Sequence, residues 1–149
     1  MRKSLAVIFF VGVSLLVTSC QREMTPESAL RGYVEYRFGE GQSISELLSR
    51  TTGPLHERLQ EMSEEEFQNF LEMREYRLRR FRVERTSCQD EQKCHLTYLL
   101  RYDQFNDNIK TFSVEVRKIA EIVAEGNTWK IADVKDVKTF FDSKEPIEP

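Results

Sequence analysis

The apolar residues of the chain recur with two different periods, and the change between them divides the chain into two parts. From Pro26 to Met73 they return every three or four positions, which is the spacing of α-helices that bury one face. From about Leu78 apolar and polar residues alternate, which is typical of half-buried β-strands. The pattern therefore predicts helices in the first part and a sheet in the second.

Four helices are predicted in the first part. Thr25 is an N-cap for a helix over Pro26–Phe38, and a second helix is expected over Ser43–Arg50. A third carries the apolar residues of Leu55–Met62. The segment Ser63–Glu66 is a capping box, in which the side chain at each end can bind the backbone amide of the other end. It therefore opens the fourth helix.

Four strands are predicted in the second part. The first contains Phe81 and Val83, and the second contains the alternating apolar residues of Leu96–Tyr102. The polar segment Asp103–Asn108 is expected to be the turn that ends the second strand. Short connections between consecutive strands favour an antiparallel meander.

The third and fourth strands complete the predicted sheet. The third begins at Phe112, and its apolar phase slips to Ile119. A β-bulge or a bend is therefore expected near Arg117–Lys118. After a turn at Gly126 the chain continues in a fourth strand that contains Trp129.

The first twenty residues form a targeting segment. Met1–Lys3 is positively charged, and a charge-free apolar run of 13 residues follows over Leu5–Val17. As a helix this run would span about 20 Å, which is less than the ~30 Å hydrocarbon core of a bilayer. A removable signal peptide over residues 1–19 is therefore expected rather than a transmembrane helix.

The end of the apolar run resembles the lipobox of bacterial lipoproteins, because the apolar Val17 and the small Thr18 and Ser19 precede Cys20. The resemblance implies cleavage before Cys20 and its acylation with fatty acids such as palmitate, which would anchor the protein to a membrane. Two or more acyl chains make such an anchor stable. Gln21 is not the aspartate that resembles an inner-membrane retention signal. The expected place is thus the outer membrane, facing the periplasm, in a Gram-negative cell, and otherwise the outer leaflet of the cell membrane.

This processing implies a simple organisation of the chain. Residues 20–25 form the lipidated N-terminus and a short tether, residues 26–141 a single domain, and residues 142–149 a loose C-terminal tail. The 149 residues include 22 Lys and Arg, 25 Asp and Glu, and 40% apolar residues, which is an ordinary globular composition. The formal net charge of −3 argues against nucleic acid as a partner.

Cys88 and Cys94 remain once Cys20 is assigned to lipid. They flank a polar segment between two predicted strands, so we expect a disulfide that closes the neck of a hairpin. Free thiols are one alternative. A metal site that adds His95 is another, but it lacks a fourth ligand at a usual spacing. No metal and no other cofactor is predicted.

Helices that precede a four-stranded antiparallel meander favour an α+β fold, with N-terminal helices packed on one face of a curved sheet. In element order the chain resembles the nuclear-transport-factor-two-like superfamily, the cone fold shared with polyketide-cyclase-like and ketosteroid-isomerase-like proteins. The resemblance rests on the helix Pro26–Phe38, the region Ser43–Met73 and four strands that end in Thr128–Val134, and it covers about Pro26–Lys138. A cystatin-like or another helix-on-sheet domain is the alternative.

The cone-fold resemblance implies a pocket between the helices and the sheet. Enzymes of the superfamily use an inward carboxylate or histidine there, near a tyrosine. The residues that fit such a pocket are Tyr98, Tyr102, Phe112, Trp129 and Asp133. Burial would raise the pKa of Asp133 and make it a base. Val134 breaks the alternation after Asp133, however, so that a bulge could turn this carboxylate outward.

A run of arginines marks the first predicted strand. Arg77, Arg79, Arg80 and Arg82 form a candidate patch for anionic lipid headgroups or an acidic partner. The alternative is a solvated strand face whose charges pair with the acidic residues of Glu57–Glu75.

No catalytic, phosphate-binding or dinucleotide-binding motif occurs in the sequence. We therefore expect a membrane-anchored, extracytoplasmic lipoprotein without catalytic activity, which binds a small apolar ligand or a neighbouring envelope protein. The alternative is a small cone-fold enzyme that uses Asp133 and the pocket tyrosines on a small molecule.

Overall fold

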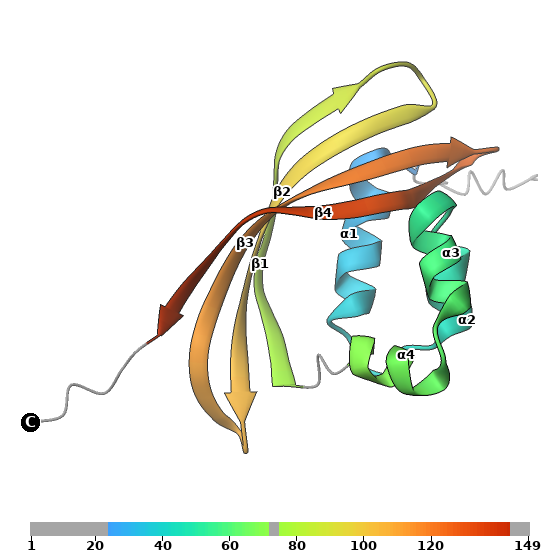
Figure 1. Ribbon diagram of the computed structural model, residues 1–149. Helices are drawn as coiled ribbons and strands as arrows, with labels where there is room; N and C mark the ends of the chain where they lie inside the picture. Colours follow the sequence, from blue (N-terminus) through green and yellow to red (C-terminus); the bar gives the residue numbers. More distant parts are fainter. Residues whose placement is uncertain (1–23, 72–74, 144–149) are drawn as a thin grey trace, which may run out of the picture.

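Four helices and then four strands follow one another along the chain, in the order that the change of period predicts (Figure 1). The computed structural model describes residues 24–71 and 75–143, and within these no helix is long and apolar enough to span a membrane. The expected signal peptide, Cys20 and residues 144–149 of the expected tail lie outside the described residues. The elements are α1 (Pro26–Arg37), α2 (Ile44–Ser49), α3 (Gly53–Glu61), α4 (Glu64–Leu71), β1 (Tyr76–Cys88), β2 (Lys93–Asn106), β3 (Ile109–Glu125) and β4 (Thr128–Ser143).

Two helices begin at the capping boxes of their sequences. At α1 the Thr25 hydroxyl accepts a hydrogen bond from the Ser28 amide (3.1 Å), and the Thr25 amide donates to the Ser28 hydroxyl (2.9 Å). At α4 the Glu66 amide donates to the Ser63 hydroxyl (3.2 Å), and the Ser63 amide donates to the Glu66 carboxylate (2.7 Å). Each box satisfies two amides at the start of its helix. Both predicted starts are confirmed.

The four strands form one open antiparallel sheet in the order β1-β2-β3-β4. This confirms an α+β fold with a four-stranded antiparallel sheet. The turn between β2 and β3 consists of Asp107 and Asn108, whose φ angles are +48° and +64°. Asp and Asn adopt this left-handed conformation more readily than other residues with a side chain.

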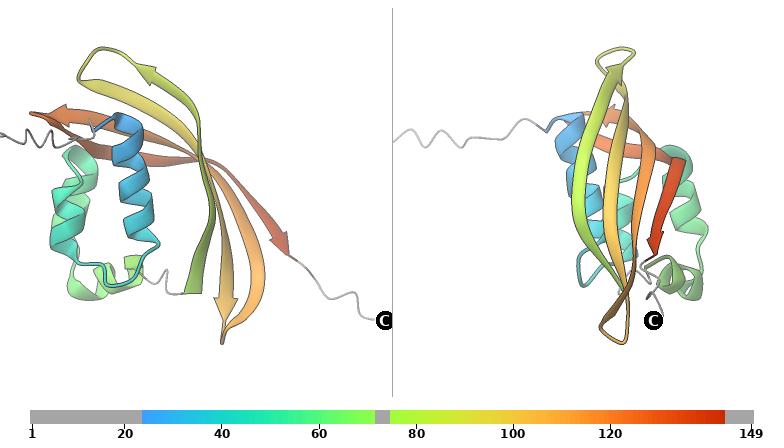
Figure 2. Two further views of the ribbon diagram at one scale, coloured as in Figure 1. Left: turned by 180° about the vertical axis from the view of Figure 1, so that it is seen from behind. Right: turned by 90° about the vertical axis from the view of Figure 1, so that its left-hand side faces the viewer.

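Bulges bend the two edge strands. β1 has an extra residue at Arg79 and another at Glu84, and β4 has one at Ala132 and another at Val137. A bulge kinks its strand and increases the local twist. Figures 1 and 2 show the result, in which a strongly bent and twisted sheet has the helices on the inner side of the bend.

One cluster of buried side chains contains residues of the helices and of the sheet. Leu30 and Leu47 come from the helices, Leu96 and Ile122 come from the strands, and none of the four has exposed surface. Full burial of an aliphatic side chain of this size contributes about 2 kcal/mol to the free energy of unfolding. We call the sheet face that carries Leu96 and Ile122 the inner face, and the opposite one the outer face.

The irregularity predicted near Arg117 is present, since the register between β3 and β4 shifts between Arg117 and Lys118, but the apolar phase of β3 itself does not slip. Val116, Lys118, Ala120 and Ile122 of β3 keep to the inner face, whereas Ile119 is 38% exposed on the outer face. The apolar pattern misleads here because a lysine occupies an inner position and an isoleucine the next outer one. The extra residue of the register shift belongs to β4.

The predicted turn Asp103–Asn108 and the predicted end of the domain at residue 141 also differ from the structure. β2 continues through Asp103 to Asn106, and β4 continues to Ser143. Cross-strand pairing decides the outcome in both places, since strand preference depends on the neighbouring strands more than on composition. Asp103 is paired with residues of both β1 and β3, and the end of β4 is paired with the start of β3.

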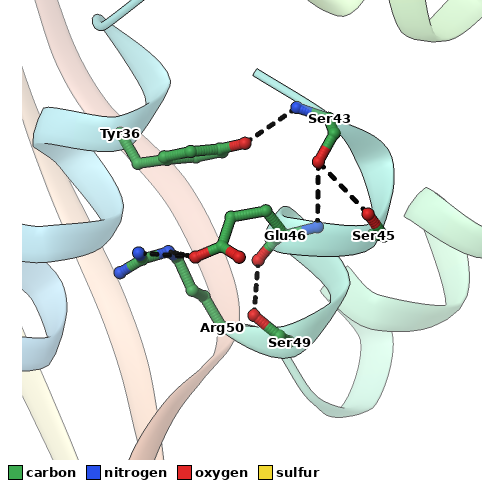
Figure 3. A network of polar contacts seen from close by, with 6 residues as sticks. All are labelled: Tyr36, Ser43, Ser45, Glu46, Ser49 and Arg50. Carbon is green, nitrogen blue, oxygen red and sulfur yellow. Dashed lines mark hydrogen bonds and ion pairs between the residues drawn. The ribbon is translucent and has the colours of Figure 1, made fainter. Parts of the chain in front are cut away.

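A polar network fixes α2 beside α1 (Figure 3). The Tyr36 hydroxyl accepts a hydrogen bond from the Ser43 amide (2.8 Å), and the Ser43 hydroxyl accepts one from the Glu46 amide (3.3 Å). Arg50 donates to the Glu46 carboxylate at 2.7 Å, and its guanidinium lies 5.1 Å from the centre of the Tyr36 ring. The short helix α2 therefore has a defined position next to the C-terminal half of α1.

The segment after α2 is attached to the edge strand β4. The Ile131 amide donates to the Arg50 carbonyl, and the Thr52 amide donates to the Ile131 carbonyl, each at 3.0 Å. These bonds cover part of a sheet edge that would otherwise present unpaired backbone groups.

Candidate functional site

A disulfide joins Cys88 to Cys94, which confirms the predicted pair. The two residues are direct partners in the β1–β2 register, so the bond closes the neck of the hairpin. Nε2 of the neighbouring His95 lies 3.1 Å from the Glu121 carboxylate, and Nζ of Lys93 lies 2.9 Å from the same group. Because both cysteines are in the disulfide, a metal site with His95 has no thiolate ligand left.

A cavity of about 70 Å³ lies between α1 and the inner face of the sheet, and it is partly open to solvent. The C-terminal half of α1 forms one wall, and β2, β3 and β4 form the other. The lining residues are Tyr33, Val34, Arg37, Phe38, Tyr98, Leu100, Tyr102, Lys118 and Val134.

The cavity contains only part of the predicted pocket. Tyr98 and Tyr102 line it. Phe112 pairs with Ser143 at one end of β3, and Trp129 lies at the opposite end of the sheet beside the β3–β4 turn. Both aromatic residues are outside the lining because the cavity is beside the middle of the sheet.

Asp133 is also outside the cavity, because a bulge turns its carboxylate outward, which is one of the two directions that the sequence leaves open. The extra residue Ala132 places Asp133 opposite Glu121 in the register and gives the inner position to Val134. The Asp133 carboxylate accepts a hydrogen bond from Arg58 of α3 at 3.0 Å. Asp133 therefore binds a helix at the edge of the sheet and does not face the pocket tyrosines.

Arg37 is the charged residue that α1 contributes to the cavity wall. Its guanidinium lies 3.6 Å from the centre of the Phe70 ring, and it donates to the Phe70 carbonyl (3.4 Å) and the Tyr33 hydroxyl (3.3 Å). Its Nε is buried and has no hydrogen-bond partner among the described residues. A buried donor without an acceptor costs about 1–3 kcal/mol.

Three tyrosines add hydroxyl groups to the same cavity. The Tyr33 oxygen accepts a hydrogen bond from Arg37, which leaves its own proton available for donation. Tyr98 is 1% exposed, and its hydroxyl forms no hydrogen bond within residues 24–71 and 75–143. Burial raises the pKa of Tyr98 and of Tyr102. Both hydroxyls therefore remain protonated donors at neutral pH.

Lys118 is the cation that the sheet contributes. Its Nζ lies 2.5 Å from Oδ1 of Asp136, whose side chain is 58% exposed and outside the lining. The lining residues themselves include no carboxylate and no imidazole, and Val34, Leu100 and Val134 supply aliphatic surface. The wall is therefore mostly apolar and carries donors and positive charge, which favours an apolar group that bears an acceptor of negative charge.

The volume limits what the cavity can enclose. An engineered apolar cavity of about 150 Å³ holds a benzene molecule, and a single water molecule needs about 10–15 Å³. A cavity of about 70 Å³ therefore takes a group of a few heavy atoms. A larger molecule would extend through the open side.

Comparisons with known proteins bear on the fold. No protein-family model and no curated protein matches the sequence. The solution structure of RPA3114, a SEC-C motif containing protein from Rhodopseudomonas palustris, is 16% identical over 76% of this chain and 80% of that chain, with a TM-score of 0.55. The crystal structure of the intermembrane space region of the chloroplast protein ARC6 is 13% identical over 76% of this chain and 97% of that chain, with a TM-score of 0.51. At these identities the likeness shows a shared fold alone.

Two arginines of the predicted patch are held by neighbours on the sheet. Nε of Arg79 lies 2.7 Å from the Asp103 carboxylate, and the Arg77 guanidinium lies 4.2 Å from the centre of the Phe105 ring. The predicted alternative, in which the run pairs with acids of Glu57–Glu75, is wrong for Arg79. The reason is that the helices lie on the inner side of the sheet, whereas this arginine binds a neighbouring strand.

The other two arginines lie in the middle of the outer face. Arg82 shares the Glu84 carboxylate with Arg117 of β3, at 2.8 and 2.7 Å. The hydrogen bond from Arg117 lowers the pKa of Glu84. Arg80 lies directly opposite Arg101 in the register, and neither forms an ion pair with another described residue.

Asp103 is a buried anion that the sequence pattern does not reveal. It is 3% exposed, and it binds Ser113 (2.6 Å), Arg79 (2.7 Å) and Lys110 (3.0 Å). Burial alone would raise the pKa of Asp103, but the hydrogen bonds from Ser113, Lys110 and Arg79 outweigh it and hold the pKa well below its usual value. Asp103 therefore ties three strands together and stays ionised.

Arg37 and Lys118 are the charged residues of the cavity wall that sequence reasoning misses. Arg37 lies four residues after Tyr33, on the helix face that is buried against the sheet, and Lys118 lies two residues after Val116 on a buried strand face. A charged residue at a position that the period assigns to the interior is the signal that could have found both.

Proposed function

We propose that this chain is a lipid-anchored, extracytoplasmic protein that binds a small organic acid in the cavity beside α1, without catalysing a reaction. The lipobox-like end of the apolar run, Val17–Cys20, supports the anchor. The disulfide supports export, because such bonds persist mainly in oxidising compartments. Gln21 after the acylated cysteine supports the outer membrane as the location in a Gram-negative cell.

The hydrogen-bond donors in the cavity are the main support for the proposed binding of an organic acid. Arg37 and Lys118 bring positive charge, and Tyr33 and Tyr98 bring hydroxyl protons. A carboxylate accepts several hydrogen bonds, and its bonds to charged donors are stronger than neutral ones. The aliphatic part of the wall suits a short alkyl chain, and the volume limits that chain to a few carbons. A short monocarboxylate meets all of these conditions.

The enzyme alternative needs a base inside the cavity. Asp133 is turned away and bound by Arg58. His95 is bound to Glu121 on the outer face, and Nδ1 of His56 lies 3.2 Å from the Leu48 carbonyl oxygen. These placements favour binding without catalysis.

We also propose that the domain is a cone fold of the nuclear-transport-factor-two-like superfamily, with its N-terminal helices packed on one face of the curved sheet. The support is the shared cluster of buried helix and strand residues, together with the position of the helices inside the bend (Figure 2).

Ligand-observed NMR tests the binding role. The lipidated chain is purified from membranes in a non-ionic detergent and mixed with butyrate or with butyramide, its neutral isostere. Saturation transfer from the protein to the butyrate methyl group is expected, and much weaker transfer to butyramide. Arg37→Gln should weaken butyrate binding about tenfold, because it removes charge-assisted hydrogen bonds. Arg31→Gln, on the same helix but outside the cavity, is the matched control.

A second variant keeps this test informative if Arg37→Gln fails to fold. Tyr98→Phe removes one hydroxyl with little change of shape, and it should weaken butyrate binding severalfold. Equal transfer to butyrate and butyramide, or butyrate binding that neither variant changes, would contradict the proposed site.

Mass spectrometry tests the anchor separately. The mature protein extracted from membranes should carry acyl mass on Cys20, and Cys20→Ala should carry none. A mature wild-type chain that begins at Gln21 or later and has no acyl mass would contradict the anchor.

A further inference from the structure

Cations predominate in the middle of the outer face of the sheet. In the register, three consecutive rows across the four strands bring together side chains that we call the basic band: Arg80, Arg82, Arg85, Arg101, Arg117, Lys135 and Lys138. All of them except Arg117 are exposed. Within these rows Glu115 lies opposite Arg101 and Glu84 lies at the bulge of β1, and the acidic residues Asp103 and Glu121 lie in the rows beyond either end of the band. The outer face therefore has a positive centre.

The charges of the basic band are only partly compensated within the described part of the chain. Arg82 and Arg117 share Glu84, and Lys135 pairs with Asp133 at 3.3 Å, but Arg80, Arg85 and Arg101 form no ion pair there. Arg80 and Arg101 are direct cross-strand partners, and like charges in such positions destabilise a sheet. Glu115 is the other cross-strand partner of Arg101, but it forms no ion pair with it among the described residues. The repulsion is therefore only partly relieved, and an external anion would relieve the rest.

The basic band coincides with the bend of the sheet. The bulges at Glu84 and Val137 lie within its rows, and Figure 1 shows the strands bending near their middle around the helices. The outer side of a bend is convex, so the middle rows protrude while the acidic rows at Asp103 and Glu121 recede. A convex surface with cations at its crest fits a flat anionic surface.

We propose that the basic band docks on the anionic headgroups of the membrane that holds the lipid anchor. This inference rests on the proposed anchor, because residues 20–25 would hold the domain within about 20 Å of the lipid and keep the local concentration of headgroups high. Phe140 is 45% exposed on the same face, 4.6 Å from Nζ of Lys138. Aromatic rings are favoured at membrane interfaces, so this ring adds an apolar contact.

Fluorescence quenching in vesicles tests the docking. The lipidated chain carries a fluorophore at Ile119→Cys inside the band, or at Glu35→Cys on α1 as the reference position. It is reconstituted into phosphatidylcholine vesicles with or without phosphatidylglycerol, and the quencher is a lipid with a spin-labelled headgroup. Quenching at position 119 should be about threefold stronger in the anionic vesicles and should fall as salt is added, because salt screens exposed charges. Quenching at position 35 should not depend on the lipid.

Two double variants with equal changes of net charge distinguish the contribution of the basic band to docking from that of the rest of the surface. Arg80→Glu with Arg101→Glu should reduce quenching at position 119 to its value in neutral vesicles. Arg31→Glu with Arg58→Glu, on the helices, should leave it unchanged. If the first pair fails to fold, as judged by circular dichroism, Lys135→Gln with Lys138→Gln replaces it and should lower the quenching at least twofold.

Three outcomes would overturn the proposal. The first is equal quenching at positions 119 and 35 in anionic vesicles, and the second is an effect of equal size from the two charge-reversal pairs. The third is a crosslink in cells from position 119 to an acidic protein, without quenching in vesicles. The acyl mass of each preparation separates failure of the anchor from failure of the band.

Discussion

Arg79 and Asp103 lie on neighbouring strands with Nε 2.7 Å from the carboxylate, although 54% of the arginine side chain is exposed and only 5% of the aspartate side chain. Ser113 and Lys110 of β3 bind the same carboxylate from the other side. The Asp103 carboxylate is therefore ionised and surrounded by hydrogen-bond donors. Its removal would weaken the interactions among β1, β2 and β3.

Asp103→Asn should lower the free energy of unfolding at pH 7 by about 2 kcal/mol, because it leaves charged and hydroxyl donors without their acceptor. The folded state holds the pKa of Asp103 below its value of about 3.9 in an unfolded chain. Its stabilisation is therefore complete above about pH 4 and is lost as the pH falls through the folded-state pKa. Urea unfolding at pH 7 and pH 3 should show a smaller acid loss in the variant than in the wild type. Glu40→Gln, at an exposed loop position, is the control, and identical acid losses in variant and wild type would contradict the assignment.

Removal of the disulfide should destabilise the domain without unfolding it. The loop closed by Cys88 and Cys94 has seven residues, and the chain-entropy relation gives about 2.4 kcal/mol for such a loop. The double variant Cys88→Ala and Cys94→Ala should show this loss in chemical unfolding. Reductant should produce a similar loss in the wild type and none in the double variant. A wild type that is indifferent to reductant would show that the strands alone hold the hairpin.

Loss of the α4 cap should have a smaller effect. Ser63→Ala removes the acceptor for the Glu66 amide, and the loss of such a cap typically lowers the free energy of unfolding by about 1 kcal/mol. Ser63→Asp keeps a side-chain acceptor and should retain most of the stability. Thermal unfolding of the three proteins measures the difference, and equal midpoints for serine and alanine would show that the cap contributes nothing.

The proposed location depends on a single residue after the acylated cysteine. Gln21→Asp should move the protein from the outer to the inner membrane in a Gram-negative cell, because aspartate resembles the retention signal at this position. Density-gradient fractionation followed by immunoblotting measures the distribution. An inner-membrane location for both proteins would contradict the outer-membrane proposal.

Local signals in the sequence were sufficient where the interaction partners are close along the chain. Thr25 and Ser63 bind amides three residues away, and Cys88 binds a cysteine six residues away. Each of these features could be predicted because the chemistry and the spacing lie in one short segment.

Prediction left alternatives open or failed where cross-strand geometry decides the direction of a side chain. The direction of Asp133 depends on the bulge at Ala132, and the burial of Asp103 depends on donors from two other strands. The inward position of Lys118 was not predicted, because a lysine among alternating apolar residues is read as an interruption of the pattern. These positions depend on the register between strands, which the order of residues in one strand does not specify.

The buried face of α1 has its packing partners far along the chain. Leu30 and Tyr33 share a cluster with Ile122 and Ile131 of the last two strands, and an isolated helix of this length is only marginally stable in water. A polypeptide that crosses a membrane from its N-terminus would release α1 long before those strands emerge. The helix would have no packing partner until β4 emerges, so the chain would remain unfolded during translocation. If the chain is exported as we propose, the order of helices first and strands last would therefore delay folding until export is complete.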